Sequence, residues 1–333
     1  MFSAQRLSRA ASLLLIASAA ITQACSDSAM PPSSAIQAPE QSSNDASAPG
    51  TAPTAECAAP SASWIFCDDF ESDRSASYFE IDNSAGKFAR TPGAGWGGSV
   101  GMRARYTKGQ NNAGHLSLAF GAVPDAYFRT VDAGVRKYRE IYWRYFVRRE
   151  TGWVGNGASA LTRATTFAAS NWSQAMLAVA ASEVTDNGDV RLTSYSGTDA
   201  AGNLTTVRYN DDAHLRSLSS RLTSAPVDGQ STVGKWQCYE FHVKLNDAGQ
   251  SNGVYEMFVN GQMSTTRSGL NWLGAYSAYG VNSLTLENYY SSGAPANNVR
   301  TIDNLVVATS PIGCGSTAPP PPPPAVATIT VAI

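Results

Sequence analysis

Apolar and polar side chains alternate with a period of two residues along most of the middle of the chain. Because successive side chains of a β-strand point to opposite faces, this pattern predicts strands, and no stretch there shows convincing helical periodicity. The segment 140–148 is the clearest example, with one set of side chains on each face: Ile141, Trp143, Tyr145 and Val147, then Tyr142, Arg144, Phe146 and Arg148. Only one of these faces can be core.

The same alternation predicts further strands, which lie at 64–71, 239–245, 254–259, 284–289 and 305–307. The strand at 254–259 runs into Asn260-Gly261, the strongest two-residue signal for a β-hairpin. A series of antiparallel strands with one solvated face each is typical of a sandwich or jelly roll. We therefore predict an all-β fold of two antiparallel sheets.

Low-complexity segments flank this region and predict its boundaries. Residues 26–56 are mostly Ser, Ala, Pro, Gln and Thr, so they cannot bury enough apolar surface to offset the entropy of the chain. The tail 317–333 contains six prolines at 319–324, typical of an extended spacer, and continues into alternating residues that resemble one strand of a further module. We predict a single folded module at 57–316.

The N-terminus has the pattern of a secretion signal, which we assign to 1–25. Arg6 and Arg9 precede an apolar stretch that is too short to span a bilayer permanently. Ala24-Cys25 then resembles the lipobox of bacterial lipoproteins, although Thr22 stands where leucine is usual. This resemblance implies a lipid on Cys25 that anchors the protein in the cell envelope, at the outer membrane. Ordinary cleavage and release of a secreted protein is the alternative.

Composition narrows the range of partners. Charged residues are 15% of the chain and the formal net charge is −2, so the chain has no basic field of the kind that binds nucleic acid. The 7 Trp and 14 Tyr residues offer flat rings that can stack on sugars. We expect a monomer.

Four cysteines remain when Cys25 is set aside, and an even number in an exported protein predicts two disulfides. Four cysteines allow three pairings, and the sequence does not choose among them. We favour Cys57 with Cys67 and Cys238 with Cys314. A zinc site is disfavoured because no Cys-x-x-Cys spacing is present.

Several short motifs follow one another along the module in a characteristic order. They are Asp68-Asp69-Phe70-Glu71, Tyr142-Trp143-Arg144-Tyr145-Phe146 leading into Gly152-Trp153-Val154, Trp236 through Lys244-Leu245-Asn246, Asn252-Gly253-Val254-Tyr255-Glu256, and Asp303-Asn304-Leu305-Val306-Val307. This order resembles the concanavalin A-like jelly rolls of secreted polysaccharide lyases, with alginate and glucuronan lyases nearest and heparin lyases more distant. The resemblance covers nearly the whole module.

The resemblance implies a concave sheet face that binds an extended acidic polysaccharide of uronic acids and cleaves it by β-elimination. That reaction needs a group that neutralises the uronate carboxylate, a base and an acid. We take Arg144, Arg163 and Gln174 as candidates for the first role. Tyr289 and Tyr290 are candidates for base or acid, and His115 is the histidine expected near the groove.

One departure from the family leaves catalysis open. The alginate lyases that this chain resembles carry a Gly-Gly-Lys-Leu pattern whose lysine faces the substrate, but the matching stretch 155–161 has no lysine. The loss of that cation removes a charge-assisted contact with a carboxylate. A non-catalytic glycan-binding or adhesive lipoprotein is therefore the alternative to a lyase, and a purely structural module of the cell envelope is a third.

Calcium is the one cofactor that the sequence suggests. Asp69 and Asp303, near Asp68 and Glu71, fall on strands that are neighbours in the resembling fold, and carboxylate oxygens suit Ca²⁺. Solvated carboxylates at strand ends are the alternative, and we expect no other cofactor.

Overall fold

The computed structural model describes residues 56–155, 157–183 and 188–315. The predicted signal segment 1–25 with its lipidation residue Cys25, the linker up to residue 55 and the tail from residue 316 lie outside the described residues. None of the described elements is a helix with the length and apolar character needed to cross a membrane.

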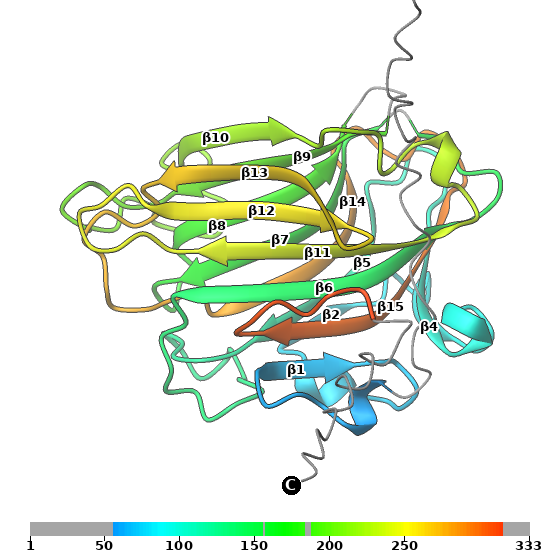
Figure 1. The fold of residues 1–333 in the computed structure, drawn as a ribbon, viewed down its shortest axis with the longest axis horizontal. Helices are drawn as coiled ribbons and strands as arrows, with labels where there is room; N and C mark the ends of the chain where they lie inside the picture. The colour runs from blue at the N-terminus through cyan, green and yellow to red at the C-terminus, as the bar shows by residue number, and fades with distance from the viewer. Residues whose placement is uncertain (1–55, 156, 184–187, 316–333) are drawn as a thin grey trace, which may run out of the picture. The chain divides into compact units, whose positions relative to one another are not determined.

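The described residues form two antiparallel sheets joined by turns and short 3₁₀ segments (Figure 1). Sheet A has the strand order β13 (Gln262–Leu270), β12 (Gly253–Val259), β11 (Trp236–Lys244), β6 (Glu140–Arg149), β15 (Val299–Ala308), β4 (Gly101–Arg105) and β3 (Phe88–Thr91), and β1 (Trp64–Asp68) also pairs with β15. Sheet B has the order β10 (Arg216–Leu222), β9 (Val190–Ser196), β8 (Gln174–Ser182), β7 (Ser159–Phe167), β14 (Ser283–Tyr290), β5 (Asn112–Ala119) and β2 (Glu80–Asp82). The 3₁₀ segments are η1 (Glu56–Ala58), η2 (Ser75–Ser77), η3 (Trp96–Gly98) and η4 (Gln230–Thr232). The predicted all-β fold is confirmed.

The inner faces of the two sheets share one hydrophobic core. Trp143 on β6 and Phe241 on β11 stack with ring centroids 5.0 Å apart, and both belong to the same buried cluster as Leu161 and Leu286 of sheet B. Each large side chain buried in this way stabilises the fold by about 1.5–3 kcal/mol. Trp143 Nε1 also donates a hydrogen bond to Thr162 Oγ1 at 3.2 Å, which links the sheets.

Segments from both ends of the module cover part of the outer face of sheet A. The two disulfides join Cys57 to Cys67 and Cys238 to Cys314, which confirms the favoured pairing. The second attaches the segment after β15 to β11, where the backbone N–H groups of Ile312 and Gly313 donate to the Glu240 carboxylate at 2.8 and 2.9 Å. A polar side chain that faces outward from the middle of sheet A is therefore not necessarily exposed to solvent.

Candidate functional site

A groove of about 450 Å³ lies on the outer face of sheet B. Strands β2, β5, β7 and β14 form its floor, and the turn between β7 and β8 and the segment between β9 and β10 add side chains to it. The lining residues are Glu80, Asn112, Gly114, His115, Ser117, Arg163, Trp172, Tyr209, Asn210, Thr285, Glu287, Asn288 and Tyr289. Three of the predicted site residues, His115, Arg163 and Tyr289, are therefore brought together.

Strand alternation places these side chains. On β14, Leu284 and Leu286 are buried in the core, so Thr285 and Glu287 point away from it. Thr285 lies opposite Ser117 of β5 and opposite Arg163 of β7. The Thr285 and Ser117 hydroxyl oxygens are 3.1 Å apart, which forms a polar row across the floor of the groove.

Arg163 is held by three neighbours. Its Nε donates to Glu287 Oε1 at 2.8 Å, its Nη1 donates to Asn210 Oδ1 at 2.9 Å, and its guanidinium lies 5.5 Å from the centre of the Tyr209 ring. Burial by itself would lower the pKa of Arg163, but the Glu287 carboxylate and its neighbours raise that pKa overall, so the side chain stays cationic. Its charge is already balanced by Glu287.

His115 lies at the β2 side of the groove. Its Nε2 is 3.7 Å from Glu80 Oε2, and its side chain is 26% exposed. The preceding residue, Gly114, has a φ of +106°, and a Cβ there would lie 2.5 Å from both Asp82 O and Phe88 Cβ. Only glycine allows β2 and β3 to approach β5 this closely, and the pairing of β2 with β5 brings Glu80 beside the imidazole.

Aromatic side chains form one wall of the groove. Trp172 and Tyr209 line the groove, and the Trp172 ring lies between those of Tyr127 and Tyr209, with centroids 5.4 and 5.6 Å away. Trp172 has a φ of +66°, a left-handed conformation that is rare for a bulky residue. Such conformations persist only where the surrounding structure imposes them, and they concentrate at functional sites. Tyr127 and Tyr209 remain 52% and 37% exposed, so their rings are accessible.

Arg144 does not lie in the groove, so that part of the predicted site is wrong. It belongs to β6 of sheet A, is 1% exposed, forms an ion pair with Glu56, and places its guanidinium 4.8 Å from the centre of the Phe146 ring. Alternation correctly put Arg144 on the face away from the core. It could not indicate that this face belongs to the other sheet and is covered by the segment that contains Glu56.

Tyr290 also lies outside the groove, because it points into the core while its neighbour Tyr289 points outward. Tyr290 is 1% exposed, and Asn298 Nδ2 donates to its phenolic oxygen at 3.2 Å. Burial raises the pKa of Tyr290. Tyr289 is 45% exposed and lines the groove.

Gln174 supports the groove without lining it. It is fully buried at the start of β8, and its Oε1 accepts a hydrogen bond from the Asn210 N–H at 2.9 Å. Its Nε2 is buried with no partner among the described residues. Gln174 therefore holds the segment that carries Tyr209 and Asn210.

Sequence reasoning missed several groove residues. Glu287 could have been found, since it alternates with Leu286 in a predicted strand. Trp172 and Tyr209 lie between strands, where no periodicity shows which way a side chain points, and Glu80 lies in a strand of three residues that is too short for a pattern. None of the residues that line the groove is a lysine.

The two calcium candidates are used as hydrogen-bond acceptors within the fold. Asp303 accepts from the Trp96 N–H at 2.7 Å, Ser99 Oγ at 3.0 Å and the Asn304 N–H at 2.8 Å. Asp69 Oδ2 accepts from the Cys57 N–H at 3.3 Å. Within the described part of the chain, no three His, Cys, Asp or Glu side chains are grouped so that they could hold a metal ion.

No family model matches this sequence, and no curated protein matches it significantly. Solved structures do resemble it. The PL-14 alginate lyase from Aplysia kurodai has a TM-score of 0.52 and 13% identity over 75% of this chain and 100% of that chain. An endo-β-1,4-glucuronan lyase from the fungus Trichoderma reesei has a TM-score of 0.51 and 11% identity over 74% of this chain and 96% of that chain. At such identities the similarity establishes the jelly-roll fold alone.

Proposed function

We propose that this protein binds a polysaccharide chain along the outer face of sheet B. The observation that carries the proposal is the combination of accessible rings and polar groups in one groove. Tyr209 and Tyr289 are half exposed beside the row of Ser117 and Thr285 hydroxyls. A sugar presents apolar ring faces and hydroxyl edges, so it can stack on the rings while its hydroxyls bond to the polar row.

Arg163 is the groove residue that would bind the carboxylate of an acidic polysaccharide. Its planar guanidinium matches a carboxylate, and Asn210 and Tyr209 hold it in place. Because Glu287 occupies it, a uronate has to replace the Glu287 carboxylate at the guanidinium. We therefore expect weaker binding of acidic polymers than an unpaired arginine would provide.

β-Elimination is the second candidate function, favoured because His115 and Tyr289 line the same cavity. His115 would remove the proton on the carbon that bears the carboxylate. The adjacent C–O bond to the leaving sugar would then break as a C=C double bond forms, and Tyr289 would protonate the departing oxygen. Arg163 would stabilise the charge that develops on the carboxylate once Glu287 is displaced.

Two substitutions at Tyr289 separate binding from elimination, because this side chain is 45% exposed and its loss does not disturb the core. Binding to alginate, polyglucuronate and heparin is measured by affinity electrophoresis, and elimination by the ultraviolet absorbance of the unsaturated product. Tyr289→Ala removes the ring and should weaken binding about tenfold, which corresponds to about 1.4 kcal/mol. Tyr289→Phe keeps the ring, so it should retain binding and abolish any elimination.

The wild-type protein and the Phe variant together decide between the candidates. Retention on a polymer with no absorbance increase supports binding alone. An absorbance increase that Tyr289→Phe abolishes supports the lyase. Equal binding by all three proteins would contradict the groove as the binding site.

A further inference from the structure

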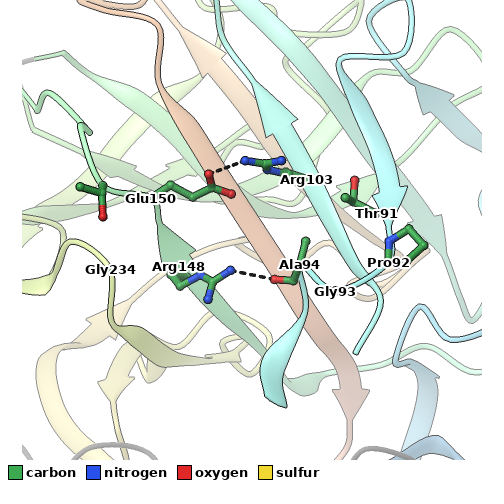
Figure 2. Close-up of a pocket in the computed structure, with 9 residues that line it drawn as sticks. Thr91, Pro92, Gly93, Ala94, Arg103, Arg148, Glu150 and Gly234 are labelled. Carbon is green, nitrogen blue, oxygen red and sulfur yellow. Dashed lines mark hydrogen bonds and ion pairs between the residues drawn. The ribbon is translucent and has the colours of Figure 1, made fainter. Parts of the chain in front are cut away.

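A second cavity, of about 440 Å³, lies on the outer face of sheet A (Figure 2). Arg103 of β4 and Arg148 of β6 line it together with Glu150, Thr91 and Ala94. Its volume is in the range of small-molecule binding sites. This cavity shares no residue with the groove on sheet B.

Strand register brings the two arginines to one site. Arg103 pairs with Thr301 of β15, and Thr301 pairs with Arg148 of β6, so the three residues form a row across neighbouring strands. With one strand between them, the two Cα atoms are about 10 Å apart, a gap that two arginine side chains can span. Thr301 is fully buried in the middle of the row, and its hydroxyl has no hydrogen-bond partner among the described residues.

Both arginines have N–H groups for which no described residue provides an acceptor. Arg103 Nη2 contacts Glu150 Oε2, whereas Arg148 Nη2 donates to the Ala94 carbonyl at 3.0 Å (Figure 2). Arg148 pairs with no carboxylate of the described residues; its guanidinium lies 4.9 Å from the centre of the Trp236 ring. The Nε atoms of both arginines are buried without a partner, and neither Nη1 bonds to a described residue.

The charge of this cavity is opposite in sign to that of the groove. Two guanidiniums and one carboxylate give the cavity a formal charge of +1, whereas Arg163 with Glu80 and Glu287 gives the groove −1 with His115 neutral. Guanidinium N–H groups left without an acceptor favour an anionic partner, and charge-assisted bonds to oxyanions are among the strongest that a side chain makes. The electrostatics of the molecule therefore favour an anion on sheet A.

We propose that this cavity binds the carboxylate or sulfate group of an acidic saccharide between Arg103 and Arg148. The oxyanion follows from the guanidinium geometry alone, and its saccharide carrier rests on the proposed function. Glu150 limits the affinity, since its carboxylate competes with the ligand for Arg103.

The test is a titration followed by NMR of the arginine Nε–H signals, which reports on each site separately. Sodium glucuronate and sodium sulfate should shift the signals of Arg103 and Arg148, and glucose at matched ionic strength should not. Tighter binding of glucuronate identifies the saccharide acid as the ligand, and tighter binding of sulfate identifies a free oxyanion. A shift of the Arg163 signal alone would overturn this proposal while supporting the groove. No shift of any arginine signal with either anion would overturn this proposal without supporting the groove.

Three variants complete the test. Arg148→Gln should weaken glucuronate binding about tenfold, the loss of one charge-assisted contact. Glu150→Gln should strengthen it about threefold, because a like charge near the ligand is removed. Arg221→Gln, an exposed arginine on β10 of sheet B, should leave the affinity unchanged. Equal affinity of the wild type, Arg148→Gln and Glu150→Gln would overturn the site even if one variant folds poorly, because the Glu150 ion pair is partly exposed and contributes little to stability.

Discussion

At the scale of single residues, Glu287 controls the charge that the groove presents. It is 6% exposed and neutralises the one arginine among the groove residues. Burying a guanidinium without a partner would be costly, so the carboxylate stabilises the unliganded protein. The same contact competes with an acidic ligand.

Replacing Glu287 should therefore change selectivity. We expect Glu287→Gln to raise the affinity for polyglucuronate about tenfold, since the freed guanidinium gains a charge-assisted contact, and to leave binding of a neutral glucan unchanged. Affinity electrophoresis at two salt concentrations measures both. Glu80→Gln is the matched control, because Glu80 lines the groove without contacting Arg163, and an equal gain in this control would show that only the overall charge matters.

At the scale of elements, Gly114 decides how close β5 lies to its neighbours. A side chain there would meet both the Asp82 carbonyl and the Phe88 side chain, so the strands would have to separate. His115 follows directly, and its distance from Glu80 depends on the same packing. Strand packing and groove geometry are thus coupled at one glycine.

Gly114→Ala should lower the free energy of unfolding by about 2 kcal/mol or more, as overpacking and a left-handed backbone act together. Gly86→Ala is the matched control: its φ is +83°, yet nothing lies within 4 Å of the added Cβ, so we expect a loss of only about 1 kcal/mol. Urea denaturation of both variants measures the difference. Similar losses would show that backbone conformation, and not packing, makes Gly114 necessary.

At the scale of the whole molecule, two buried carboxyls make stability depend on pH. Burial raises the pKa of Asp68 and of Asp303 from 3.8 to about 6, against the opposing effect of their hydrogen-bond donors. Because the folded state holds these protons more tightly than the unfolded chain, their contribution to stability is fully present below about pH 4 and is lost as the pH rises through 6. Other carboxyls act in the opposite direction, since hydrogen bonds lower the pKa of Asp73 and Asp199.

A difference between proteins isolates the effect of Asp68. The free energy of unfolding of wild type should fall by roughly 2 kcal/mol relative to Asp68→Asn between pH 4 and pH 7, because the amide cannot ionise. Urea denaturation across this range provides the measurement. Parallel pH profiles for the two proteins would mean that Asp68 is not desolvated as the structure indicates.

The sequence alone predicted the strands, the sandwich and the side chains of β14 that point away from the core, because side-chain alternation is a property of neighbouring residues. The even number of cysteines predicted two disulfides, but only the structure selected the favoured pairing. The groove itself followed from the resemblance to polysaccharide lyases, and His115, Arg163 and Tyr289 are the predicted residues that the structure places in it. The sequence left the lipid anchor at Cys25 as a prediction, which lies outside the described residues.

Only the tertiary structure distinguished Arg163 from Arg144. Both follow the same local pattern, but β7 pairs with β8 and β14, whereas β6 pairs with β11 and β15. Such pairings depend on hydrogen bonds between strands that are distant in the chain, and alternation within one strand carries no information about its partners. For the same reason, the sequence could not show that Trp172 and Tyr209, which lie between strands, line the groove. Nor could it show that Arg103 and Arg148 lie on either side of Thr301 of β15.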